Sequence, residues 1–314
     1  MNRLRIYQDP CYRDHLASIN HPESPARLQA IADAINAAPA LKDAEFSGGV
    51  PVERSALERV HDPEYLDDLA EWCRQGTFIA SAEIPVDEKS WHALRHAAGA
   101  AVDAVASAVD DEIDAAFLAI RPPGHHAERD RALGFCLVNN VAIAAGEALA
   151  RGLERVAILD FDLHHGNGTQ HIFWDEPRVL FISIHEAHLY PAFTGSVDER
   201  GGPNAIGKNI NIPLKAGSGD EALHSAFDEI CDAAISSFQP QLLLLSAGFD
   251  GHVDDPLGSL RYSDDGYKYI SNRVLQWSAV YGCKIVSILE GGYNTEVLAR
   301  CVTDHCTMLL EGKS

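Results

Sequence analysis

Three potential metal ligands stand in two short segments of the sequence. Asp162 and His164 are two residues apart, so they point to the same side if the chain is extended there. Asp250 follows a separate apolar run and adds a second carboxylate. One imidazole and two carboxylates form a shell that leaves positions open for water and substrate, as a catalytic zinc site requires. These ligands suit Zn2+, and they also suit Fe2+.

The tandem histidines His125 and His126 are predicted to do acid–base work. Two adjacent residues cannot easily both bind one ion beside a complete ligand shell. Asp160 and Asn167 are the available acceptors for their ring N–H groups. A carboxylate partner favours the imidazolium form and an amide partner leaves a histidine closer to neutral, so the two histidines could divide the work.

Three aromatic residues could complete such a site. Tyr293 follows two glycines, which permit close backbone approach, and its hydroxyl could donate to a developing oxyanion. Phe135 and Tyr190 could form the walls of an access channel. For all these residues the alternative interpretation is structural: a chance Asp-x-His pattern, Asp250 as a helix cap, satisfied loop histidines and packed aromatics.

The elements that must position these residues are five apolar runs. They are residues 115–120, 156–159, 179–184, 241–247 and 284–289. Because both faces of each run are apolar, we expect central strands of a parallel sheet covered by helices, and residues 90–109 and 138–152 have a helical pattern. Each run is followed directly by chemically active residues. Since the carboxyl ends of parallel strands share one edge, the sequence predicts a single site there, which favours the metal interpretation.

Alternating helices and strands without repeats or linkers predict one domain over residues 1–314. We expect a three-layer α/β/α sandwich with a central, mostly parallel sheet. The region 185–209, rich in Gly, Pro, Asn and aromatics, is predicted to be a long functional loop. Residues 20–28 and 75–88 are expected to be further surface loops.

The charge and composition limit the partners of the protein. The net charge of −21 makes direct binding of nucleic acid unfavourable, whereas a cationic ligand would not be repelled. The N-terminal residues lack the apolar core of a signal peptide and no segment has the length of a membrane span, so we expect a cytoplasmic protein. The seven cysteines form no C-x-x-C pair, so most are expected to be reduced core residues.

Seven segments resemble motifs of the zinc-dependent histone deacetylase and acetylpolyamine amidohydrolase superfamily, which shares its fold with arginases. In chain order, the motifs are HPESPARL, VHDPEYL, RPPGHHA, LGFCLVNNVAIAA, DFDLHHGNGTQHIF, SAGFDGHVDDPLG and LEGGYN. They extend from residue 21 to residue 294, nearly the whole chain. The resemblance implies the arginase/deacetylase-like fold and hydrolysis of an acyl-amine.

The resemblance also implies roles for single residues. Asp162, His164 and Asp250 would bind zinc, and His126 would be the general base that activates water and then protonates the leaving amine. His125 with Asp160 would give electrostatic support, and Tyr293 would hydrogen-bond the carbonyl oxygen. Asn167 matches the class II branch, in which class I members carry aspartate. The resemblance assigns further residues as follows: Phe135 and Tyr190 flank the acyl-lysine tunnel, Gly134 contributes its carbonyl, and Glu83 is the rim carboxylate.

A structural potassium site is a further implication of the resemblance. It would consist of main-chain oxygens of Asp160, Asp162, His164 and Ile184 with the hydroxyl of Ser183. One departure from the family is the loop YPAFTG, which has one residue more than the usual pattern around Tyr190 and Phe193. Because loops determine the substrate and the oligomeric state, acyl-lysine, acetylpolyamine or another amide remain candidate substrates, and a homo-oligomer is compatible with the sequence.

Two other functions fit parts of the pattern. A non-catalytic regulatory protein would keep the fold and the metal, but it would have no need of the acid–base set. An arginase-like or metallophosphoesterase hydrolase would use a two-metal centre around residues 162–165. The complete set of metal ligands, histidine pair and tyrosine favours the amidohydrolase.

Overall fold

The computed structural model describes residues 2–18, 20–76, 78–79 and 84–312. A parallel sheet with the strand order β2-β1-β5-β10-β9-β6-β7-β8 forms its centre. Its strands are β1 (Leu4–Tyr7), β2 (Glu45–Ser47), β5 (Ala115–Leu118), β6 (Val156–Asp160), β7 (Val179–Glu186), β8 (Asn209–Leu214), β9 (Leu242–Ala247) and β10 (Lys284–Leu289). A separate antiparallel pair consists of β3 (Phe78–Ile79) and β4 (Ile84–Pro85).

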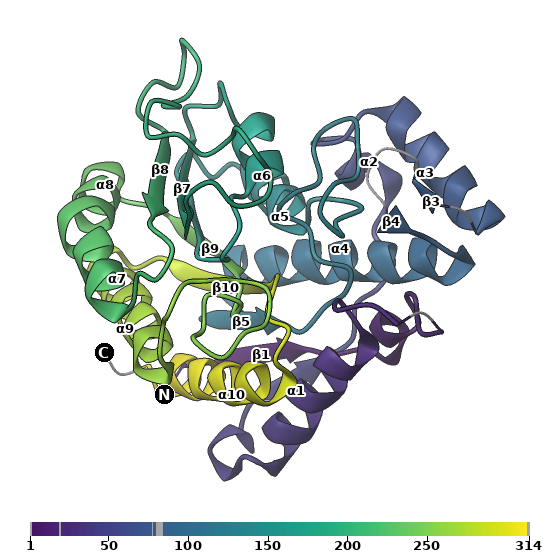
Figure 1. Ribbon diagram of the computed structural model, residues 1–314, viewed down its shortest axis with the longest axis horizontal. Helices are drawn as coiled ribbons and strands as arrows, with labels where there is room; N and C mark the ends of the chain where they lie inside the picture. Colours follow the sequence, from purple (N-terminus) through teal and green to yellow (C-terminus); the bar gives the residue numbers. More distant parts are fainter. Residues whose placement is uncertain (1, 19, 77, 80–83, 313–314) are drawn as a thin grey trace.

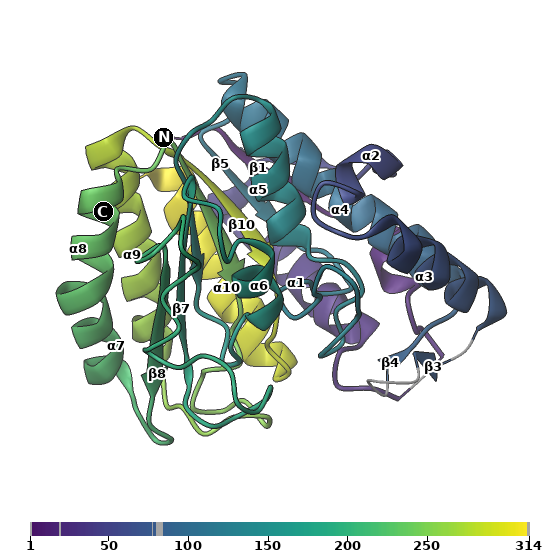
Figure 2. The same cartoon turned by 90° about the horizontal axis from the view of Figure 1, so that it is seen from above.

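Helices cover both faces of the sheet, as Figures 1 and 2 show. One layer contains α1 (Pro25–Ala37), α7 (Asp220–Ala226), α8 (Asp232–Phe238), α9 (Asp264–Tyr281) and α10 (Thr295–Glu311). The other contains α2 (Arg54–Leu57), α3 (Pro63–Gln75), α4 (Glu88–Val109), α5 (Asn140–Ala150) and α6 (Asn167–Ile172). Short 3-10 helices span Pro10–Arg13 and Pro39–Leu41, and a π-helical turn spans Phe227–Cys231. The predicted three-layer α/β/α fold is thereby confirmed.

The five predicted strands form the centre of the sheet, where helices cover both faces. Every residue of β5, β6, β7 and β9 is buried, which explains their continuous apolar character. The strands β1, β2 and β8 were not predicted. They lie toward the two edges of the sheet and interleave polar residues such as Arg5 and Asn211 with apolar ones, so they lack the continuous run that identified the others.

The predicted helices are found with small shifts in their ends. Residues 90–109 belong to α4, which starts two residues earlier because Asp87 caps it and forms a reciprocal capping box with Ser90. Residues 138–152 contain α5, whose N-terminus is capped by the Asn139 side chain. The segment 20–28 is a loop only in part, because Pro25 occupies the first turn of α1.

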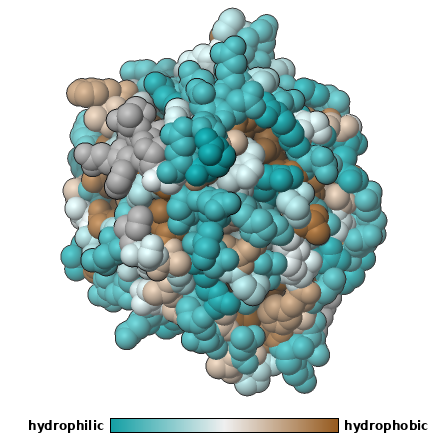
Figure 3. Space-filling view, turned by 90° about the vertical axis from the view of Figure 1, so that its right-hand side faces the viewer, coloured by the Kyte–Doolittle hydropathy of each residue, from teal (hydrophilic) through white to brown (hydrophobic). Residues whose placement is uncertain are grey.

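The loop predicted over residues 185–209 is shorter at both ends, since β7 continues to Glu186 and β8 begins at Asn209. The segment 75–88 contains β3 and β4, and part of it lies outside the described residues. All seven cysteines are buried and unpaired, as expected. Among the described residues, every helix is too short or too polar to cross a membrane. Figure 3 shows a largely hydrophilic face with apolar residues in small separate groups.

Candidate metal centre and channel

The three predicted metal ligands lie together at the carboxyl edge of the sheet. Asp162 and His164 follow β6, and Asp250 follows β9, the strand that pairs directly with β6. The Nδ1 atom of His164 lies 3.1 Å from Oδ1 of Asp162 and 3.2 Å from Oδ2 of Asp250. One potential ligand atom from each residue falls within 4.8 Å of the other two. Pairing of β6 with β9 therefore brings the two segments to one point.

The electrostatics of this cluster favour a cation. Asp162 and Asp250 are buried, and apart from its ion-pair contact with His164, Oδ2 of Asp250 has no hydrogen-bond partner among the described residues. Burial and the charge of Asp162 raise the pKa of Asp250. Burial opposes a charge on His164, but its contacts with the two carboxylates raise its pKa to about 10. A divalent ion would neutralise both carboxylates without a proton on His164, so the donor set fits Zn2+ or Fe2+.

The two tandem histidines have different partners, as the sequence suggested. His125 Nδ1 lies 3.0 Å from Oδ2 of Asp160, and His126 Nδ1 lies 2.8 Å from Oδ1 of Asn167. Burial opposes a charge on His125, but Asp160 and Asp162 raise its pKa to about 10. Burial and the neighbouring positive histidines hold the pKa of His126 well below its usual value. The pair therefore combines an imidazolium with a neutral imidazole.

The hydrogen bonds of Asn167 determine which nitrogen of His126 is free. The Nδ2 atom of Asn167 donates to Oε1 of Glu128 at 2.8 Å, which leaves Oδ1 of Asn167 facing His126. Because this oxygen can only accept, Nδ1 of His126 must carry the proton. The Nε2 atom of His126 then keeps its lone pair and can accept a proton.

A channel with a volume of about 580 Å³ leads to these residues. Its walls include predicted site residues and others that the sequence did not single out: His21, Pro123, His125, His126, Gly134, Phe135, Cys136, His164, Leu189, Tyr190, Leu257, Gly291 and Tyr293. The ring centroid of Tyr190 lies 5.2 Å from that of His126, and the ring centroid of Phe135 lies 6.3 Å from that of Tyr293. Phe193, in the same loop as Tyr190, is fully exposed. The longer loop thus still directs Tyr190 to the channel.

Two glycines allow the backbone to approach the centre closely. A Cβ atom on Gly134 would lie 2.2 Å from the His126 ring, and the φ of Gly134 is +52°. A Cβ atom on Gly291 would lie 2.2 Å from Oδ2 of Asp250 and 2.6 Å from Oδ2 of Asp162. The Gly291 N–H instead donates to Asp162 at 2.7 Å. Only glycine fits at these two contacts with the carboxylates and the His126 ring.

Tyr293 lies in the turn after β10, which the side chain of Asp255 holds in place. The Asp255 Oδ2 atom accepts from the main-chain N–H of Tyr293 at 2.6 Å and of Asn294 at 3.1 Å. The Arg27 guanidinium lies over the Tyr293 ring, 5.1 Å from its centroid. Burial raises the pKa of Tyr293 well above its usual value, so its hydroxyl is a proton donor throughout the neutral range.

The segments of the predicted potassium site are adjacent in the sheet. Asp160 of β6 is opposite Ser183 of β7, and Ile184 follows it. The loop that contains Asp162 and His164 packs against β7, because Leu163 accepts a hydrogen bond from the main chain of Glu186 at 2.8 Å. The Ser183 hydroxyl lies 2.9 Å from Nδ1 of His185. Binding of potassium stays a prediction, and Glu83, the predicted rim carboxylate, lies outside the described residues.

Several supporting residues were not predicted. Glu290 Oε2 accepts from the main chain of Gly124 at 2.6 Å and of His125 at 3.1 Å, so it holds the histidine loop. Burial raises the pKa of Glu290 to about 7. Glu128 and Asp255 orient Asn167 and the Tyr293 turn. These acids lie within or beside the quoted motifs, but their partners are distant in sequence, so no local spacing indicated their contacts.

Comparisons with known proteins agree with this arrangement. The sequence profile of the histone deacetylase domain matches residues 21–309. A probable deacetylase of Archaeoglobus fulgidus is 38% identical over 91% of this chain and 80% of its own length. A histone deacetylase-like amidohydrolase of Pseudomonas aeruginosa is 32% identical over 91% of this chain and 76% of its own length. The crystal structure of the HDA15 HD domain superposes with a TM-score of 0.92 at 33% identity, covering 98% of this chain and 90% of that one.

Proposed function

The chain belongs to the histone deacetylase family, and we propose that it is a metal-dependent amidohydrolase that removes an acyl group, such as acetyl, from an amine. The observation that carries the proposal is the pairing of two neighbouring histidines with unlike partners beside the three-ligand cluster. A binding protein would have no use for an imidazolium and a neutral imidazole at the end of a channel.

Asp162, His164 and Asp250 are the residues that would hold the divalent ion. When bound, such an ion supplies Lewis-acid chemistry, which polarises a carbonyl and makes water more acidic. The chain itself excludes bulk water, because the ligands and both tandem histidines are mostly or fully buried. The Zn2+ identity, with Fe2+ as the alternative, rests on the mixed nitrogen and oxygen donors.

The proton transfers of the proposed hydrolysis belong to His126. Its Nε2 atom takes a proton from the attacking water while Nδ1–H stays on Asn167. The same nitrogen then gives this proton to the leaving amine. His125 remains positively charged against Asp160 and stabilises the negative charge that develops on the substrate. The hydroxyl of Tyr293 donates to the carbonyl oxygen.

The shape of the channel favours a substrate whose acyl group is at the end of a narrow alkyl chain. The aromatic walls Phe135 and Tyr190 suit the methylene chain of an acyl-lysine or an acetylpolyamine. The acidic chain, with its net charge of −21, is compatible with the cationic context of either product. We propose no direct contact with nucleic acid, and a potassium ion near Ser183 would be structural.

The test measures release of the acyl group from acetyl-lysine peptides, acetylpolyamines and small N-acyl amines, with and without a chelator. We expect activity in the metal-loaded protein and its loss on chelation. His126→Ala is expected to lower kcat by about 10²–10⁴-fold because the proton acceptor is lost. Tyr293→Phe is expected to lower it by about 10²–10³-fold because one oxyanion donor is lost.

Thermal unfolding of both variants serves as the control, since neither substitution removes a metal ligand. Equal turnover of the wild type, His126→Ala and Tyr293→Phe on every substrate would support a regulatory metal-binding protein instead. Activity that survives complete removal of the metal would contradict the proposed mechanism.

A further inference from the structure

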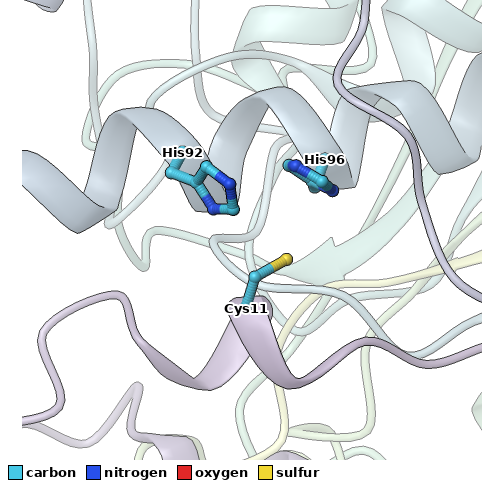
Figure 4. Close-up of side chains that lie close together, drawn as sticks. All are labelled: Cys11, His92 and His96. Atoms are coloured by element: carbon cyan, nitrogen blue, oxygen red, sulfur yellow. The ribbon is translucent and has the colours of Figure 1, made fainter.

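A second cluster of metal-ligating side chains lies away from the channel. His92 and His96 are one turn apart on α4, and Cys11 is in the 3-10 helix Pro10–Arg13 that packs against it. One ligand atom of each residue lies within 4.8 Å of the other two. In Figure 4 the Cys11 thiol points toward the helix, and both imidazoles extend from α4 on the side that faces it.

The orientation of His96 is fixed by the backbone. Its Nδ1 atom lies 2.7 Å from the carbonyl oxygen of Gly49. Because a carbonyl only accepts, Nδ1 carries the proton and Nε2 keeps its lone pair, which is the usual arrangement of a metal-binding histidine. The Gly49 backbone packs closely against α4, since a Cβ atom there would lie 2.3 Å from both the His96 carbonyl oxygen and the Tyr12 hydroxyl.

The surroundings of the cluster favour binding from solvent. Cys11 is buried, His96 is half-buried and His92 is exposed, so one side stays open for water. The Asp9 carboxylate accepts from the main-chain N–H of Cys11 at 2.9 Å and places negative charge beside the thiol.

A comparison with another cluster shows why this one stands out. His252, Asp264 and Cys301 also lie within 4.8 Å of one another. There, however, the Arg300 guanidinium donates to both oxygens of Asp264 at 2.7 and 2.9 Å. That carboxylate is already neutralised, and a fixed positive charge next to it would repel a metal ion.

We propose that Cys11, His92 and His96 form a second metal site, which takes a Zn2+-class ion. A thiolate, two imidazoles and one water give the four-coordinate shell that zinc prefers. On binding, the S–H bond of Cys11 breaks, the sulfur binds the ion and the proton leaves to the solvent. The site would join the N-terminal segment to α4, and it shares no residue with the cluster formed by Asp162, His164 and Asp250.

The experiment uses Co2+ as a probe, because a cobalt–thiolate bond has a charge-transfer absorption in the near ultraviolet that nitrogen and oxygen ligands lack. We expect this band in the intact chain and about two bound ions per chain after loading. His92→Ala, at an exposed helix position, should weaken the Co2+ affinity of the site, read from a titration of the band, by about tenfold or more. Cys11→Ser should abolish the band.

Matched controls are Cys301→Ser, in the other cluster, and Cys136→Ser, which removes a thiol of the channel; both should keep the band. The absorption band reports metal binding without any turnover, so this test is independent of the proposed function. Deacylase activity of metal-loaded His92→Ala should equal that of the wild type. A wild type that binds Co2+ without the band would overturn the proposal. So would a band that persists unchanged in both His92→Ala and Cys11→Ser.

Discussion

At the scale of single residues, the amide of Asn167 accepts a hydrogen bond from His126 without placing a negative charge beside it. A carboxylate at this position would favour the protonated imidazole, which cannot act as a base. Asn167→Asp is therefore expected to raise the pKa of His126. Because the base must be neutral, the acid limb of the kcat/KM profile should move to higher pH, by about one to three units. The measurement is kcat/KM against pH with a neutral substrate.

The control must separate charge from geometry. Asn167 Nδ2 donates to Glu128, so an aspartate there would face a second carboxylate. The double variant Asn167→Asp with Glu128→Gln relieves that repulsion and should show the same shift. Asn167→Ala, which removes the acceptor without adding charge, should lower kcat/KM without moving the acid limb of its pH profile to higher pH. An unmoved limb in the double variant would contradict the role given to Asn167.

At the scale of elements, the proposed function depends on turns that bring the backbone into close contact with the side chains of the site. Gly134 is the tightest such contact with the base, because a Cβ atom would lie 2.2 Å from the His126 ring. Gly134→Ala must displace either the turn or His126, and a misplacement of about 1 Å can cost about 10²-fold in rate. We expect a loss of kcat of this size, measured at saturating substrate.

Gly282→Ala is the matched control for this prediction. Gly282 also has a positive φ, +68°, but a Cβ atom there meets nothing within 4 Å. Both variants bear the strain of a left-handed alanine, about 1–2 kcal/mol in the free energy of unfolding. Only Gly134→Ala should lose activity per folded molecule. Equal kcat values for the two variants would show that the contact with His126 is unimportant.

At the scale of the whole molecule, a buried ion cluster joins the N-terminal segment to the turn after β10. Glu23 accepts from Arg121 Nε at 2.5 Å and from Arg27 at 3.0 Å, and Arg27 also donates to the carbonyls of Glu290 and Gly292. Burial alone would raise the pKa of Glu23, but the two arginines lower it to about 2. Glu23→Gln leaves two buried guanidinium groups without their counter-charge, and is expected to cost about 3–5 kcal/mol in the free energy of unfolding at pH 7.

The pH dependence of this loss gives a second check. Because the folded-state pKa is depressed, the contribution of Glu23 is complete above the unfolded value, near 4.3, and is lost as the pH falls toward 2. Urea unfolding of the wild type and Glu23→Gln should therefore differ most at neutral pH and converge in acid. Glu71→Gln, which breaks an exposed ion pair with Arg74, should change stability little at any pH. A constant difference across the pH range would argue against the ion cluster.

The central strands and the site residues after them could be predicted from the sequence, because a strand buried on both faces leaves a continuous apolar run and parallel strands deliver their carboxyl ends to one edge. This logic placed Asp162, His164 and Asp250 together. The edge strands could not be identified in this way, since β8 carries polar residues such as Asn209 and Asn211 that pack against other segments. The prediction of a single domain stays a prediction.

The sequence by itself determined the fold class, the candidate metal ligands and the two histidines with their hydrogen-bond partners, because these depend on residue type and on order along adjacent strands. Only the tertiary structure decided which acids support them. Glu290 holds the loop of His125, and Asp255 holds the turn of Tyr293, through contacts between segments separated by 165 and 38 residues. The cluster of Cys11 with His92 and His96 has the same origin, since packing of distant segments in three dimensions leaves no local pattern in the chain.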